Sequence, residues 1–195
     1  IVAKKLAESV FSKSESFQIL EDININDYIG ESYEPVFNVF NNEEYLAQLE
    51  NSENIWKIWH ADFITDDAGT GIAHEAPAFG AEDMELARLN NIPIIRHVNM
   101  NGKFVSDVED AVPELKGLVV KKKDDSISTD IEVVKWLAHN GKLFEKHKIV
   151  HSYPLCWRCK TPLLNYATSS WFVDVPTIKD KLISENSKVN WVPDH

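Results

Sequence analysis

The sequence is poor in cysteine, with only Cys156 and Cys159 among 195 residues. A secreted domain stabilised by several disulfides is therefore excluded, and this cysteine content is typical of a reducing, cytoplasmic compartment. No apolar run approaches the roughly 18 residues that a membrane-spanning helix requires. The first residues also lack the charged and apolar regions of a secretory signal. We therefore expect a cytoplasmic protein with no membrane partner.

Positive charge is also scarce, because 20 Lys and Arg residues face 31 Asp and Glu residues and the net charge is −11. Such a chain lacks the broad basic surface with which proteins bind duplex DNA, so we expect no DNA partner. A narrow site for the end of one strand is still compatible with this charge. With 44% hydrophobic residues, the chain can bury one core and carry a small appendage.

Apolar spacing predicts many short strands with helices between them, without the regular alternation of a doubly wound sheet. The expected helices lie at the start of the chain (Val2 to Val10) and over 43–49, 81–90, 129–140 and from 177 onward. The expected strands lie within 17–40 and over 59–67, 92–98, 117–122, 143–153 and 171–175. This order predicts an α+β fold that resembles a β-barrel with interleaved helices.

The segment GTGIAHEAPAFGAED, residues 69–83, is the first candidate site. Gly69 and Gly71 permit a positive φ or close approach of a ligand, and a helix begins directly after the loop with acids in its first turn. His74 and Asp83 could then converge on one small ligand. From these residues alone, a structural turn with a packed His74 is the more frequent outcome, because short motifs often match by chance.

The second candidate is the CxxC segment HSYPLCWRCKTPL, which contains Cys156 and Cys159. Two thiolates at this spacing can bind one zinc ion, but a structural zinc site takes about four ligands. The chain therefore supplies half a site unless His151 or another histidine joins it. A redox role would place CxxC at a helix start, whereas Thr161 and Pro162 favour a turn. Two unpaired structural thiols remain an alternative.

Together, GTGIAHEAPAFGAEDMELA and HSYPLCWRCKTPLLNYATSSWFV strongly resemble the editing insertion (connective peptide 1) of the isoleucyl-tRNA synthetase family and its return into the class I catalytic core. The resemblance extends over nearly the whole chain. It implies an editing domain over residues 1–150, with the barrel-like fold shared by the valyl and leucyl enzymes. It implies that residues 151–195 form a zinc-knuckle-like tail and the return to the core.

The same resemblance implies the chemistry. Asp83 would bind the α-ammonium of a wrongly attached amino acid, and His74 would line the pocket and exclude the larger cognate residue. Gly69, Thr70 and Gly71 would shape its wall. The reaction would be hydrolysis of the ester in mischarged valyl-tRNA(Ile) by a positioned water, without a metal in the pocket. The partners would be the 3′ end of tRNA(Ile) and the rest of the synthetase, whose catalytic domain uses ATP and magnesium.

Three parts of the family pattern are not found in this sequence: a threonine-rich strand of the editing site, the adenylate-binding motifs, and a second CxxC that would partner Cys156 and Cys159. We therefore interpret the chain as a piece of a longer polypeptide and expect it to be inactive alone, with zinc bound only if ligands come from outside. A stand-alone trans-editing hydrolase and a non-enzymatic zinc or interaction module are the two alternatives.

Overall fold

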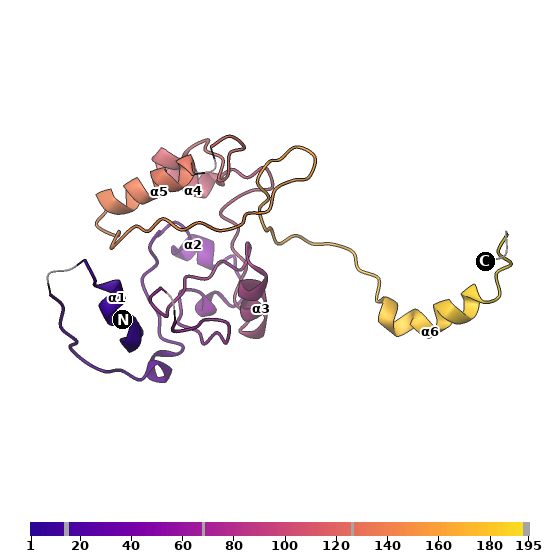
Figure 1. The fold of residues 1–195 in the computed structure, drawn as a ribbon, viewed down its shortest axis with the longest axis horizontal. Helices are drawn as coiled ribbons and strands as arrows, with labels where there is room; N and C mark the ends of the chain where they lie inside the picture. The colour runs from indigo at the N-terminus through magenta and orange to yellow at the C-terminus, as the bar shows by residue number, and fades with distance from the viewer. Residues whose placement is uncertain (14–15, 68, 126, 193–195) are drawn as a thin grey trace.

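The computed structural model describes residues 1–13, 16–67, 69–125 and 127–192. In this part of the chain, short helices alternate with long irregular segments (Figure 1). The α-helices are α1 (Ala7–Val10), α2 (Glu43–Leu46), α3 (Ala81–Leu89), α4 (Ser106–Ala111), α5 (Ser128–His139) and α6 (Val175–Asn186). The 3-10 helices are η1 (Lys4–Leu6), η2 (Ile25–Tyr28), η3 (Ser52–Asn54) and η4 (Pro113–Leu115).

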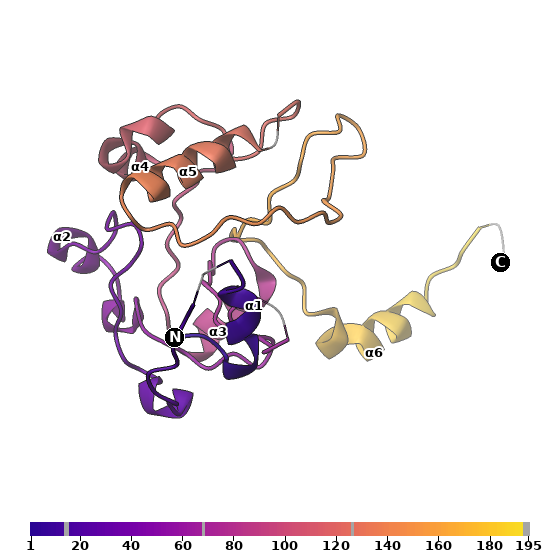
Figure 2. The ribbon, with the colours of Figure 1, turned by 60° about the vertical axis from the view of Figure 1, so that its left-hand side comes forward.

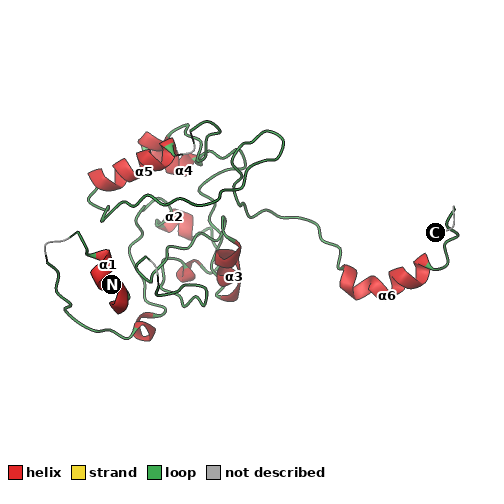
Figure 3. Cartoon of the chain, viewed as in Figure 1, coloured by secondary structure: helices red, strands yellow, loops and turns green. Residues whose placement is uncertain are grey.

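The predicted β-barrel is wrong. Figure 3 shows no strand in the described residues, where the pairing is limited to isolated bridges. The bridges join Ser32 to Lys57, Val98 to Phe104, Lys103 to Val119 and Leu155 to Pro162. Alternating apolar residues indicated extended backbone, but a sheet also needs several such segments side by side. Each bridge here spans one residue pair, so no ladder forms.

The segment 143–150 illustrates why the expected strands do not pair. It is extended, but its last two apolar side chains are open to solvent, with Ile149 75% and Val150 93% exposed. Elsewhere the chain turns back at once, as at Gly102 with a φ of 72° between bridges. Local sequence specified extended backbone and turns, but the contacts that would assemble a barrel are absent from the described residues.

The helix predictions succeed better than the strand predictions. The helix expected over 81–90 is α3, and the helix expected over 129–140 is α5, which begins at Ser128. The final helix begins at Val175, and its cap is Asp174, whose side chain accepts a hydrogen bond from the Thr177 amide. The helix expected over 43–49 is confirmed only as the single turn of α2.

The core gathers around α4, η4 and the neighbouring loop that precedes α2. Its buried side chains are Phe40, Val108, Val112 and Leu115. Aromatic rings close its edge, since Phe37 stacks on Trp136 of α5 with their centroids 4.5 Å apart. Figures 1 and 2 show α4 and α5 side by side, above the loops that carry the first candidate site.

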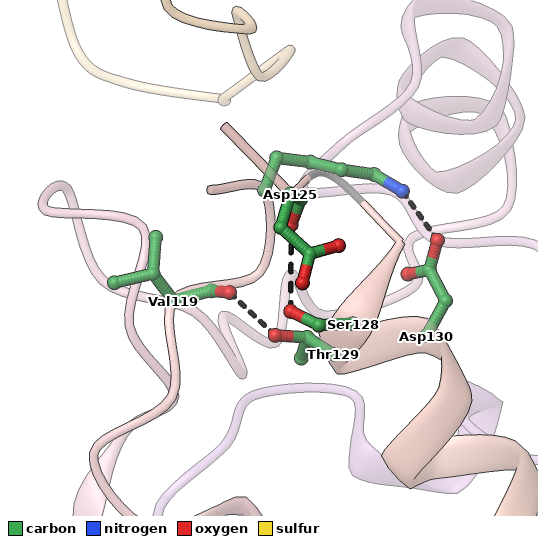
Figure 4. Close-up of polar contacts among 6 residues, drawn as sticks. Val119, Asp125, Ser128, Thr129 and Asp130 are labelled. Carbon is green, nitrogen blue, oxygen red and sulfur yellow. Dashed lines mark hydrogen bonds and ion pairs between the residues drawn. The ribbon is translucent and has the colours of Figure 1, made fainter. Parts of the chain in front are cut away.

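Helix α5 is attached to the core by the hydroxyl of Thr129, which is 2% exposed (Figure 4). Its Oγ1 donates to the Val119 carbonyl oxygen at 2.7 Å. On the outer side of the same turn, Lys121 Nζ donates to Asp130 Oδ2 at 2.6 Å. Thr129 thus lies inside the first turn of α5 and joins the helix to the segment before it.

The segment after residue 167 leaves the rest of the molecule, and α6 stands apart from it in both views (Figures 1 and 2). Trp171 is fully exposed and Phe172 is 89% exposed. The division of the chain near Val150 stays a prediction, and its final residues, 193–195, lie outside the described residues. None of the described helices is long and apolar enough to cross a membrane.

We predict that Thr129→Val lowers the free energy of unfolding by about 1–3 kcal/mol, because it leaves the partly buried Val119 carbonyl without its hydrogen bond. Urea denaturation measures this change. The control is Ser128→Ala, which removes a longer contact to the Asp125 carbonyl oxygen (3.4 Å) and should change stability by less than about 0.5 kcal/mol. Equal effects of the two substitutions would contradict this role for Thr129.

Candidate functional site

The GTG turn, residues 69–71, is fixed against the start of the chain. Gly69 and Gly71 have φ values of 64° and 75°, a conformation that L side chains rarely adopt. The Ala3 amide donates to the Thr70 carbonyl oxygen at 2.8 Å. A Cβ at Gly71 would lie 2.7 Å from Ala3 Cβ, so this approach needs glycine. The turn therefore depends both on the positive φ of its glycines and on the close packing of Gly71 against Ala3.

A hollow of about 230 Å³ lies at this turn. It is lined by Phe63, Ile64, Thr65, Gly69, Thr70, Gly71, Ile72 and Ala73. The three residues predicted to shape a pocket wall are therefore all at its surface. The lining is largely backbone and small or aliphatic side chains, which suits a small apolar group.

Asp83 organises the loop that follows the hollow. It lies in the first turn of α3, and its Oδ2 accepts a hydrogen bond from the Ala76 amide at 2.8 Å. A Cβ at Gly80 would lie 2.7 Å from Asp83 Cγ, so glycine leaves room for the carboxylate. The helix N-terminus favours this negative charge. Asp83 is therefore a structural acceptor for the loop as well as a candidate binding group.

Glu75 is a member of this site that the sequence interpretation missed. Burial, a hydrogen bond with the Asp83 side chain and the charges of Asp83 and Glu82 raise the pKa of Glu75 from 4.5 to about 7. The Glu75 carboxyl therefore keeps its proton up to about pH 7, as a partly buried carboxyl group beside other acids does. The available signal was the presence of acids on both sides of one tight loop.

The structure places His74 at the surface of the loop, next to Glu75. Behind it, His97 packs edge-on against Phe79, with their ring centroids 4.6 Å apart. Burial, followed by the charge of His74, lowers the pKa of His97. His74 therefore presents an accessible imidazole above a histidine that favours its neutral form.

The two cysteines lie in one tight turn, as their spacing predicts. The Cys156 amide donates to the Thr161 carbonyl oxygen and the Lys160 amide donates to the Cys156 carbonyl oxygen, both at 2.9 Å. Lys160 closes the turn with a φ of 59°. Hydrogen bonds with Thr161 and with Cys156 lower the pKa of the Cys159 thiol to about 7. This turn favours the thiolate, which is the form that binds metals.

The fit of zinc to these residues is partial. The structure describes no group of three or more His, Cys, Asp or Glu side chains that could hold a metal ion among residues 1–13, 16–67, 69–125 and 127–192. His151 instead has its Nδ1 2.9 Å from the Ser152 carbonyl oxygen and packs near Tyr153. The chain therefore offers Cys156 and Cys159 as two ligands of the roughly four that zinc takes.

Curated relatives match this chain over most of its length. It is 37% identical over 195 residues to the isoleucine–tRNA ligase of Clostridium tetani, covering 100% of the chain and 17% of that protein. It is 42% identical over 172 residues to the ligase of Treponema denticola, covering 85% of the chain and 14% of the relative. The probable cytoplasmic isoleucine–tRNA ligase of Dictyostelium discoideum is 36% identical, with coverage of 100% and 18%.

The chain is homologous to a segment of isoleucine–tRNA ligases. These are aminoacyl-tRNA ligases, and the chain spans between 14% and 18% of the length of these three. No family model matches it. The resemblance stated from the sequence is therefore confirmed at the level of the ligase, and its assignment to the editing domain stays a prediction.

We predict that the Glu75 carboxyl titrates near pH 7 in a carbon-13 NMR titration. Its folded pKa lies above the unfolded value of 4.5. Its contribution to stability is therefore complete below pH 4.5 and is lost as the pH rises through about 7. Glu75→Gln should remove this part of the pH dependence of unfolding, whereas Glu85→Gln, on the outer face of α3, should leave it. Titration of Glu75 near 4.5 would refute the raised pKa.

We predict that the 195-residue chain binds zinc weakly, because two thiolates leave about half of the coordination sphere to water. Competition with a chromophoric chelator measures the affinity, and Cys159→Ser should abolish the residual binding. Stoichiometric zinc that survives dialysis would overturn the half-site interpretation. His151→Ala would then show whether that histidine is a ligand.

Proposed function

We propose that this chain contributes the editing site of an isoleucine–tRNA ligase, which hydrolyses the ester of mischarged valyl-tRNA(Ile). The observation that carries the proposal is the hollow at the GTG turn, followed along the chain by the Asp83 carboxylate at the start of α3, which the Ala76 amide orients. Homology to isoleucine–tRNA ligases supports the same reaction context. The partners would be the 3′ end of tRNA(Ile) and the rest of the ligase.

Such a ligase needs a second pocket for an energetic reason. One methylene group is worth only about 1–3 kcal/mol of discrimination, and isoleucyl-tRNA synthetase is the standard example of this limit. A hollow too small for isoleucine could accept valine and reject the cognate side chain. The hollow beside Gly69, Thr70 and Gly71 has a lining of glycine and mainly aliphatic side chains, which suits a small apolar side chain.

Asp83 would bind the α-ammonium of the misattached amino acid by a charge-assisted hydrogen bond. Its carboxylate is already oriented, because the Ala76 amide binds Oδ2. His74 would line the pocket beside the amino acid and the terminal adenosine. A water positioned in the pocket would attack the ester carbonyl, the bond to the ribose oxygen would break, and that oxygen would take up a proton. The products would be valine and tRNA(Ile).

The cofactors follow from the same proposal. The editing reaction would use no metal, while ATP and magnesium would act in the catalytic domain of the ligase. Cys156 and Cys159 would bind zinc together with two ligands from outside this chain, and their turn, which favours the thiolate, supports this role. The ligase would act in the cytoplasm.

In the ligase that carries this chain, Asp83→Asn should slow deacylation of valyl-tRNA(Ile) by at least about 100-fold, because removing one charge of a buried pair costs about 3–5 kcal/mol. Asparagine keeps an oxygen that can accept the Ala76 hydrogen bond, so the loss would report charge rather than loop structure. Activation of isoleucine, measured by pyrophosphate exchange, should be nearly unchanged. Glu85→Gln, on the exposed face of the same helix, is the matched control.

His74→Ala should act differently from Asp83→Asn. By enlarging the pocket, it should allow hydrolysis of correctly charged isoleucyl-tRNA(Ile), which the unaltered ligase spares. Deacylation assays with both esters measure the two effects. Normal editing by the Asp83→Asn variant would show that another group binds the ammonium and would overturn the proposal.

A further inference from the structure

The chain that leaves the CxxC turn runs directly to the candidate site. Residues 163–167, here called the brace, begin beside the turn, where the Leu163 amide donates to the Pro154 carbonyl oxygen at 3.0 Å. Leu164 then packs beside Gly102, where a Cβ would lie 3.6 Å from Leu164 Cδ1. The brace therefore crosses the hairpin of residues 98–104 on its way to the loop.

The brace ends on the HEAPAFG loop itself. The Ala167 amide donates to the Ala78 carbonyl oxygen at 2.8 Å, and Arg96 Nε donates to the Ala167 carbonyl oxygen at 3.1 Å. Leu164, Tyr166 and Ala167 are partly buried, whereas residues 168–192 are exposed. Contact between this segment and the rest of the chain thus concentrates where it meets the loop.

Phe79 connects the brace to the candidate site. Its ring lies edge-on to Tyr166, with centroids 5.7 Å apart, and edge-on to His97 at 4.6 Å. The Phe79 amide donates to the Ala76 carbonyl oxygen at 2.8 Å, and the Ala76 amide in turn donates to Asp83. The position of the Phe79 ring is therefore linked through one residue of backbone to the Asp83 carboxylate.

We propose that Tyr166 is a positioning residue of the candidate site: its ring holds Phe79 against His97 and so fixes the loop that carries His74 and is bound by Asp83. The catalytic part of this proposal rests on the proposed editing function. Tyr166 acts through Phe79 and does not itself touch substrate. The segment after the CxxC turn thereby becomes part of the editing pocket's support.

The first test is hydrogen exchange in the 195-residue chain, measured at the amides of Ala76 and Phe79. Tyr166→Ala should raise both exchange rates at least about tenfold, because opening of the loop exposes both hydrogen bonds. Tyr166→Phe keeps the ring and should restore the unaltered rates. Tyr153→Ala removes a tyrosine from the same tail that packs near His151, and it is the matched control.

The second test is deacylation by the ligase that carries this chain. Tyr166→Ala should lower kcat for valyl-tRNA(Ile) about tenfold to hundredfold with little change in KM, because a misplaced loop loses reactive geometry. Tyr166→Phe should restore kcat. A general loss of stability would not give this split between kcat and KM, nor the rescue. Tyr166→Leu, which keeps apolar volume without the ring, replaces the alanine variant if that variant fails to fold.

The experiments distinguish a failure of the positioning role of Tyr166 from a failure of the proposed editing function. Unchanged exchange rates at the Ala76 and Phe79 amides in the Tyr166 variants would show that Tyr166 does not fix the loop, whatever substrate the ligase hydrolyses. Faster amide exchange with an unchanged kcat, in a ligase whose editing depends on Asp83, would show that Tyr166 is not a positioning residue for the reaction. If Asp83→Asn edits normally, the proposed function falls, while the exchange rates still decide whether Tyr166 fixes the loop.

Discussion

The hydrogen bond from the Ala76 amide to the Asp83 carboxylate organises the candidate site. It joins the end of an irregular loop to the first turn of α3, and it requires glycine at position 80 to admit the carboxylate. Loops of this kind have few regular backbone partners, so one charged acceptor at a helix N-terminus determines much of their shape. The bond closes residues 76–83 shortly after His74, whereas the GTG turn before His74 is held by the bond from the Ala3 amide to the Thr70 carbonyl oxygen.

The same bond has an electrostatic consequence. In a chain of net charge −11, burial and then the neighbouring Asp83 and Glu82 raise the pKa of Glu75, which keeps its proton to about pH 7. An ammonium group brought to this point would meet an excess of negative charge. The acidic composition, which argues against a broad nucleic-acid surface, is therefore compatible with a narrow site for a cationic group on the end of a tRNA.

The second half of the chain supports this site from outside. The CxxC turn and the brace together run from Pro154 to Ala167 and end against the HEAPAFG loop. Beyond that point the apolar side chains of Trp171 and Phe172 are exposed.

The sequence alone determined the local features: the helices α3 and α5, the tight turns at glycine, the CxxC turn, and the likeness to isoleucine–tRNA ligases. Each depends on residues that are close together in the chain, so helix caps, residue spacing and backbone preferences are enough to predict it. The tertiary structure decided what depends on distant partners. The extended segments form no barrel because they do not lie side by side in the described residues. Glu75 keeps its proton because folding partly buries it beside Asp83, and Tyr166 lies beside Phe79 because folding brings separated segments into contact.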